Sequence, residues 1–256
     1  MSVWVRFCCL SLLSLLFYSA IAESQPSAKA NHHIYLLIGQ SNMAGRAPII
    51  EADNKPLEKG FVLNSEGQWE SAKNPLNQYS TIRKNLKMQK SNLGYSFTSS
   101  MLEGQSGITI GLVVNAKGGS KIESWKPGSH FYKEALNRTK IAMKSGVLKG
   151  ILWHQGESNS SQPEGYVKKL EGLITQLRKD FDQPDLPFVA GQVFYDARKK
   201  AGTEKINAEI IKLSKTVKRT EVVLSNGLST YDNTHFDSKS IVELGLRYAE
   251  KMKSIK

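Results

Sequence analysis

The segment Gly-Gln-Ser-Asn-Met-Ala-Gly at residues 39–45 places a serine hydroxyl where it could act as a nucleophile. It directly follows residues 34–38, a continuous apolar run that predicts a strand buried on both faces. Such a strand would deliver Ser41 to the carboxyl edge of a parallel sheet, where open α/β sheets place their ligand sites. Serine is also a common helix N-cap, so the local pattern alone leaves both interpretations open.

An aspartate and a histidine three residues apart, Asp232 and His235, follow the last apolar run and precede a helical segment. The aspartate can orient the imidazole and stabilise its charged form while the histidine takes a proton from a serine. An isolated pair of this kind means little. The chain order Ser41, Asp232, His235, with each residue after an expected strand, indicates a Ser-His-Asp triad.

Two other polar segments also follow expected strands. The paired glycines Gly118 and Gly119 would let backbone N–H groups approach a ligand, although a loop that only needs a positive φ would use them too. The amide of Gln155 could donate to an oxyanion. Glu157 could act on a proton or a metal, or accept hydrogen bonds from the loop. His154 is expected to be structural, since strand alternation points its side chain away from that of Gln155.

Together these segments resemble the SGNH-hydrolase superfamily, in its branch of sialate O-acetylesterase-like proteins and carbohydrate esterase family 6. The matching motifs are residues 39–45, residues 111–120 with Ile122 and Trp125, Trp-His-Gln-Gly-Glu-Ser at 153–158, and residues 232–235 followed by 244–249. They span nearly the whole chain after its N-terminal leader, and the first and third are highly specific.

The resemblance implies a serine esterase in which Ser41 is the nucleophile and Asp232 and His235 complete the triad. The backbone N–H groups of Ser41 and of Gly119 (or Gly118) would form the oxyanion hole together with the amide of Gln155. The broader superfamily has asparagine where this branch has Gln155.

Other side chains are expected to contact the substrate or to support the catalytic groups, namely Gln40, Asn42, Glu157 and Trp125. The mechanism needs no metal and no organic cofactor.

Strands and helices alternate from residue 94 onward, which predicts a parallel sheet with helices on both faces. Helices are expected over 95–103, 130–145, 165–181, 204–218 and 238–253, and strands over 34–38, 108–114, 148–153, 188–194 and 222–225. We expect one three-layer α/β/α domain whose flavodoxin-like sheet has about five strands. Residues 47–92 are long and irregular, as functional or covering segments often are, and 60–64 can pair with 68–70 as a small hairpin.

The N-terminal leader has the composition of a signal peptide. Arg6 precedes the largely apolar residues 7–18, and Ala20-Ile21-Ala22 is an A-x-A cleavage site. We expect cleavage after Ala22, export to a periplasm or the outside, a single domain over residues 23–256, and no stable membrane insertion. An uncleaved amino-terminal anchor is the alternative.

Cysteine and charge exclude several classes of protein. The two cysteines, Cys8 and Cys9, lie in the leader, which excludes a disulfide scaffold, a thiolate zinc site and a cysteine nucleophile in the mature protein. Lysine and arginine outnumber acidic residues 35 to 23, a net charge of +12. The basic residues are spread along helical segments and form no nucleic-acid-binding motif, so we expect solvated helix faces and no nucleic-acid partner.

The resemblance therefore implies an esterase that removes O-acetyl groups from carbohydrate through an acetyl-enzyme, and the leader predicts that it is secreted. The resemblance covers acetylxylan esterases as well as sialic-acid deacetylases. A lipase or thioesterase of the same superfamily would need a broad apolar groove, which the polar residues 47–92 disfavour. A non-catalytic glycan-binding module is disfavoured by the intact Ser41, Asp232 and His235.

Overall fold

The computed structural model describes residue 1, residues 25–195 and residues 200–255. The expected leader, with Cys8, Cys9 and the cleavage site after Ala22, lies outside this range.

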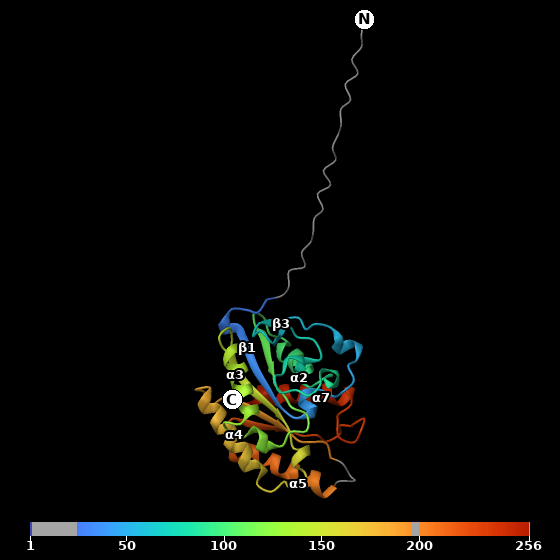
Figure 1. Cartoon of the computed structure of the whole chain (residues 1–256), viewed down its shortest axis with the longest axis vertical. Helices are drawn as coiled ribbons and strands as arrows, with labels where there is room; N and C mark the ends of the chain where they lie inside the picture. The colour runs from blue at the N-terminus through green and yellow to red at the C-terminus, as the bar shows by residue number, and fades with distance from the viewer. Residues whose placement is uncertain (2–24, 196–199, 256) are drawn as a thin grey trace.

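A seven-stranded sheet forms the middle of the molecule (Figure 1), in the order β3-β2-β4-β1-β5-β6-β7. The strands are β1 (His32–Gly39), β2 (Gly60–Leu63), β3 (Trp69–Ser71), β4 (Thr109–Val114), β5 (Val147–His154), β6 (Phe188–Gly191) and β7 (Thr220–Val223). All neighbouring pairs are parallel except β2 and β3. The central strand β1 is almost entirely buried, as its apolar sequence requires.

Two layers of helices cover the sheet. One face carries α3 (His130–Ala142), α4 (Tyr166–Asp180), α5 (Lys200–Ile211) and α6 (Leu213–Thr216), and the other carries α2 (Gly94–Leu102) and α7 (Ser238–Ser254) (Figure 1). Their apolar residues recur at helical spacing on one side. In α7, for example, Ile241, Leu244, Tyr248 and Met252 face the sheet. The three-layer α/β/α architecture is as predicted.

The five expected strands and their flavodoxin-like order are confirmed, since β4, β1, β5, β6 and β7 are neighbours in that order. The expected number of strands is too small by two. The hairpin of β2 and β3 joins the sheet, with β2 parallel to β4. All four residues of β2 are buried, and pairing with β4 gives its backbone hydrogen-bond partners that water cannot supply there. The helix expected over 204–218 is divided into α5 and α6.

The irregular residues 47–92 are fastened to the carboxyl end of β4. The side chain of Asn77 accepts from the backbone N–H of Ala116 and donates to its carbonyl. The backbone N–H of Thr81 donates to the side chain of Asn115, at 3.0 Å. These bonds hold the following residues, including Lys84, at the edge of the sheet where β4 ends. Among the described helices, none combines the length and the apolar character needed to cross a membrane.

Candidate active site

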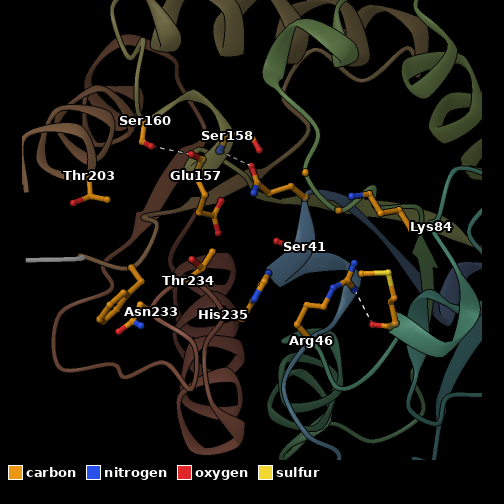
Figure 2. A pocket seen from close by; sticks show the side chains of 15 residues that line it. Ser41, Arg46, Lys84, Glu157, Ser158, Ser160, Thr203, Asn233, Thr234 and His235 are labelled. Atoms are coloured by element: carbon orange, nitrogen blue, oxygen red, sulfur yellow. Dashed lines mark hydrogen bonds between the residues drawn. The ribbon is translucent and has the colours of Figure 1, made fainter. Parts of the chain in front are cut away.

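A pocket of about 350 Å³ lies at the carboxyl edge of the sheet, beyond the ends of β1, β4 and β5. Figure 2 shows that Ser41 stands in its middle, with His235 beside it. Glu157, Ser160 and Thr203 are on one side of Ser41, and Arg46 and Lys84 are on the other. The residues that line it include Gln40, Ser41, Arg46, Lys84, Met88, Gly118, Gly119, Glu157, Ser158, Phe194, Asn233, Thr234 and His235.

The turn from β1 into the short helix α1 (Ser41–Ala44) presents Ser41 to the pocket. Gly39 has φ +142°, and a Cβ there would lie 2.2 Å from the carbonyl oxygen of His154. Only glycine lets β1 end so close to β5. Gln40 occupies the N-cap position of α1, and Ser41 is the first helical residue. The interpretation of Ser41 as a helix cap is therefore wrong, and Ser41 lines the pocket.

His235 and Asp232 form a close pair on the loop before α7. The Nδ1–H of His235 donates to Oδ2 of Asp232 at 2.6 Å, and Oδ1 accepts from the backbone N–H groups of Thr234 and His235. Burial alone would raise the pKa of Asp232, but these hydrogen bonds outweigh it and lower the pKa. With Nδ1 held by the carboxylate, the other end of the ring points toward Ser41 (Figure 2).

Asn42 connects the Ser41 turn to the His235 loop. Its Nδ2 donates to the carbonyl of Thr234 at 3.2 Å, and its Oδ1 accepts from the N–H of Phe236 at 3.2 Å. The same Nδ2 donates to Oε1 of Glu157 at 2.6 Å. Asn42 is buried and does not line the pocket, so it positions other residues and does not contact a ligand.

Glu157 lines the pocket as a mostly buried carboxyl group. Burial raises its pKa to about 7, although the hydrogen bond from Asn42 favours the ionised form. Its Oε1 lies 4.0 Å from Nε2 of His154. His154 is fully buried, and its Nδ1 bonds with the hydroxyl of Tyr248 at 3.1 Å. Burial lowers the pKa of His154 to about 3, which keeps this histidine neutral, and it faces α7 as a structural residue would.

The paired glycines bring backbone close to Ser41. A Cβ on Gly118 would lie 3.7 Å from Cβ of Ser41, so a larger residue would narrow the space next to the serine. Gly119 has φ +74°, a conformation that L side chains rarely adopt. Within the described part of the chain, the N–H groups of Ser41, Gly118 and Gly119 donate to no backbone or side-chain acceptor, and they are available to a ligand.

Gln155 does not lie where the sequence predicted it. The side chain is fully buried and does not line the pocket, and its Nε2 donates to Oε1 of Gln40, to the carbonyl of Ser120 and to Oδ1 of Asn159, at 2.8 to 3.1 Å. Strand alternation does separate it from His154, as expected. However, its side chain lies in the packed layer beneath the pocket, where the hydroxyl of Tyr166 also donates a hydrogen bond to it.

Gln40, and not Gln155, provides a side-chain amide at the pocket wall. Its Oε1 accepts from the Gln155 side chain and from the backbone N–H groups of Gly156 and Ser158. Among the described residues, Nε2 of Gln40 has no hydrogen-bond partner, and Gln40 lines the pocket. An amide whose oxygen is held by three donors has a fixed orientation, and its N–H₂ group is free for a ligand.

Trp125 is also placed differently from the expectation. Its ring is fully buried, packs edge-on against Trp153 at 5.5 Å, and donates from Nε1 to the hydroxyl of Ser120. It supports the loop after β4 through Ser120 and does not line the pocket. An aromatic residue near a motif is as compatible with a core position as with a binding site, so its type alone could not decide.

Several residues of the pocket were not predicted. Arg46 directly follows the Ser41 motif, and its position beside that motif was the one signal that could have identified it. Lys84, Met88 and Thr203 come from segments without a recognisable motif. In the described ranges, no group of three His, Cys, Asp or Glu side chains is arranged to hold a metal ion.

Comparison with known proteins identifies the family of this chain. Residues 31–254 match a family model described as carbohydrate esterase, sialic acid-specific acetylesterase. The chain is 30% identical over 243 residues to probable carbohydrate esterase At4g34215 of Arabidopsis thaliana, which covers 86% of this chain and 89% of that protein. The crystal structure of that Arabidopsis thaliana protein superposes with a TM-score of 0.80 at 27% identity, covering 88% of this chain and 100% of that one.

The crystal structure of NanS shares the fold, with a TM-score of 0.71 at 14% identity, covering 88% of this chain and 98% of that chain. The family model spans nearly all of the described residues and includes every residue assigned to the pocket. The chain therefore belongs to the carbohydrate esterase family of sialic acid-specific acetylesterases.

Proposed function

We propose that this carbohydrate esterase is a secreted serine hydrolase that removes O-acetyl groups from sugars through an acetyl-enzyme. The observation that carries the proposal is the position of His235, held by Asp232 on one side and pointing toward Ser41 on the other (Figure 2). This is the arrangement that lets a histidine activate a serine.

In the first half of the reaction, Oγ of Ser41 attacks the acetyl carbonyl carbon and its proton passes to Nε2 of His235. The Asp232 carboxylate stabilises the imidazolium and keeps the ring oriented. The tetrahedral intermediate then collapses, the carbon–oxygen bond to the sugar breaks, and His235 gives its proton to the sugar oxygen. Ser41 is left acetylated and the deacetylated sugar departs.

In the second half, His235 takes a proton from water and the resulting hydroxide attacks the acetyl-enzyme. Collapse of this second intermediate releases acetate and returns the proton to Ser41. In both intermediates the carbonyl oxygen carries negative charge. We propose that the N–H groups of Ser41 and Gly119 (or Gly118) stabilise it, and that the Gln40 amide, held by Gln155, is a side-chain donor to it.

The lipase and thioesterase alternatives have less support. Met88 and Phe194 give the pocket some apolar surface, but the charged or polar side chains of Arg46, Lys84, Glu157 and Asn233 interrupt it, and a long acyl chain would gain little by burial among them. A glycan-binding module without catalysis would not need the hydrogen-bonded Asp232 and His235 beside a serine.

The family description and the named relatives support an acetylated sugar as substrate, with sialic acid as the first candidate. Export rests on the A-x-A leader of the sequence. The test is release of acetate from O-acetylated sialic acids, acetylated xylan and acyl esters of increasing chain length. Hydrolysis of acetyl esters with a steep loss toward longer chains supports the proposal, whereas a preference for long acyl chains would favour a lipase.

A further inference from the structure

Arg46 is a buried arginine in the wall of the pocket. Only 7% of its surface is exposed, although arginine is rarely buried without a partner. Its Nη1 donates to the carbonyl oxygens of Gly45, at 2.6 Å, and of Met88, at 2.9 Å. These two bonds fix the plane of the guanidinium and leave Nη2 without an acceptor in the described part of the chain.

The free nitrogen lies over the glycine beside the nucleophile. A Cβ placed on Gly118 would be 2.5 Å from Nη2 of Arg46 and 3.7 Å from Cβ of Ser41. The space above Gly118 is thus shared by the guanidinium and the serine. A substrate group that becomes bonded to Oγ of Ser41 would lie next to this space above Gly118.

The charge of Arg46 has no counterion among the described residues. No carboxylate forms an ion pair with it, and the Glu157 carboxyl of the same pocket instead accepts a hydrogen bond from Asn42. Burial lowers the pKa of Arg46, and Tyr231, a neutral group at physiological pH, opposes that shift. A buried cation without a partner is costly, so a negative charge that forms in this space would be strongly stabilised.

We propose that Arg46 is a catalytic residue that stabilises the negative charge formed on the acetyl carbonyl oxygen. As Oγ of Ser41 bonds to the carbonyl carbon, the π electron pair of the carbonyl moves onto its oxygen, which then faces Nη2. When the sugar oxygen leaves, the pair returns to re-form the carbonyl of the acetyl-enzyme. This role rests on the proposed function. The shared position above Gly118 favours it over a subsite for an anionic group elsewhere on the sugar.

The experiment compares Arg46→Gln with the wild type on p-nitrophenyl acetate, a neutral substrate with no sugar. Loss of one oxyanion donor lowers kcat by about a hundredfold or more, and we expect that loss with a much smaller change in KM. Inhibition by trifluoroacetone, which forms a tetrahedral adduct with serine, should weaken by a similar factor. Lys87→Gln removes one charge from an exposed position outside the pocket and is the matched control.

Because Nη1 also holds two carbonyl groups, kcat is expressed per folded molecule. Arg46→Lys is the second variant. Its single nitrogen cannot serve both the carbonyls and the oxyanion, so it should also lose activity, though less than Arg46→Gln.

An unchanged kcat in whichever variant folds would overturn the role of Arg46, as would an effect on KM alone. A loss confined to acetylated acidic sugars would instead identify an anion subsite. A wild type inactive on every acetyl ester would overturn the proposed function and this role with it.

Discussion

The Nε2 of Gln155 donates a 3.0 Å hydrogen bond to Oε1 of Gln40, the residue immediately before Ser41. Gln155 is buried beneath the pocket and Gln40 is at its wall. The amide of the third motif therefore acts on the first motif and does not face the ligand. We therefore expect Gln155 to influence the reaction by fixing which way the Gln40 amide points.

This relationship predicts strongly non-additive effects. Gln40→Ala should lower kcat by about a hundredfold, as expected for one oxyanion donor. Gln155→Ala should cost less, because the N–H groups of Gly156 and Ser158 still hold the Gln40 oxygen. With the Gln40 amide already removed, the further substitution of Gln155 should change kcat little. A double-mutant cycle on kcat, at matched folded fraction, measures this coupling. Independent, multiplicative losses would show that Gln155 contacts the reacting group itself.

Ser41→Ala should abolish turnover and leave the fold intact, because Ser41 makes no side-chain hydrogen bond that the described structure depends on. Loss of a triad nucleophile can lower kcat by about a millionfold. A fluorophosphonate that reacts with activated serines should label the wild type and not the variant, as intact-mass spectrometry would show. Ordinary acetylesterase activity in Ser41→Ala would contradict the assignment of the nucleophile.

Substitution of the two histidines near the pocket should have different effects, on activity for His235 and on stability for His154. His235→Ala should be nearly as inactive as Ser41→Ala, and Asp232→Asn should lose on the order of ten-thousandfold in kcat, because the ring loses its orientation and charge stabilisation. His154→Ala leaves a cavity next to Tyr248 and should lower the denaturant midpoint more than kcat per folded molecule. If His154→Ala were inactive and fully stable, the roles would have to be exchanged.

Glu157→Gln should change how stability depends on pH. Burial raises the pKa of the Glu157 carboxyl from 4.5 to about 7. Between these values the folded protein retains a proton that the unfolded chain has released, so this group makes the free energy of unfolding fall as pH rises. Removing it should make the variant gain stability over the wild type across that window, by up to about 1.4 kcal/mol per pH unit.

Urea unfolding from pH 4 to 8 checks this prediction. Burial lowers the pKa of His154 to about 3, so His154 has the opposite effect, making stability fall as pH drops below 6.5. It is present in both proteins, and its contribution cancels in the difference between them. A difference that stays flat across the window would mean that Glu157 ionises as an exposed carboxyl does.

The sheet could be predicted from sequence because the hydrophobic patterns that specify its strands lie within the strands themselves. The apolar run of β1 and the alternation of strands and helices after residue 94 fix buried strands and their crossovers. The hairpin of β2 and β3 was also visible, but its attachment to β4 was not, since nothing in its own residues states which edge it joins. That choice depends on the packing of Phe61 and Val62 against the rest of the core.

The part of the site that could be predicted from sequence consists of residues that follow the ends of strands. Ser41 and His235 line one pocket, and Asp232 bonds to His235, as their positions after strands suggested. The sequence predicted the wrong position for the Gln155 side chain. Strand alternation places neighbouring side chains on opposite faces of the sheet, but it does not indicate which face borders the pocket. That depends on the turn at Gly156, with φ +157°, and on the three donors that hold Gln40. Arg46 acquires its environment only when Met88 folds back over it.

The bonds of Asn42 to the His235 loop join residues separated by 192 and 194 positions in the chain. During synthesis the serine turn emerges early, and its partner loop emerges only after all seven strands. Contacts across such distances form late, since a long loop must close before they can exist. Catalytic competence is therefore acquired at the end of folding. In a refolding experiment, acetylesterase activity should return no earlier than the tryptophan fluorescence of the core, and a nascent chain that ends before the last helix should be inert.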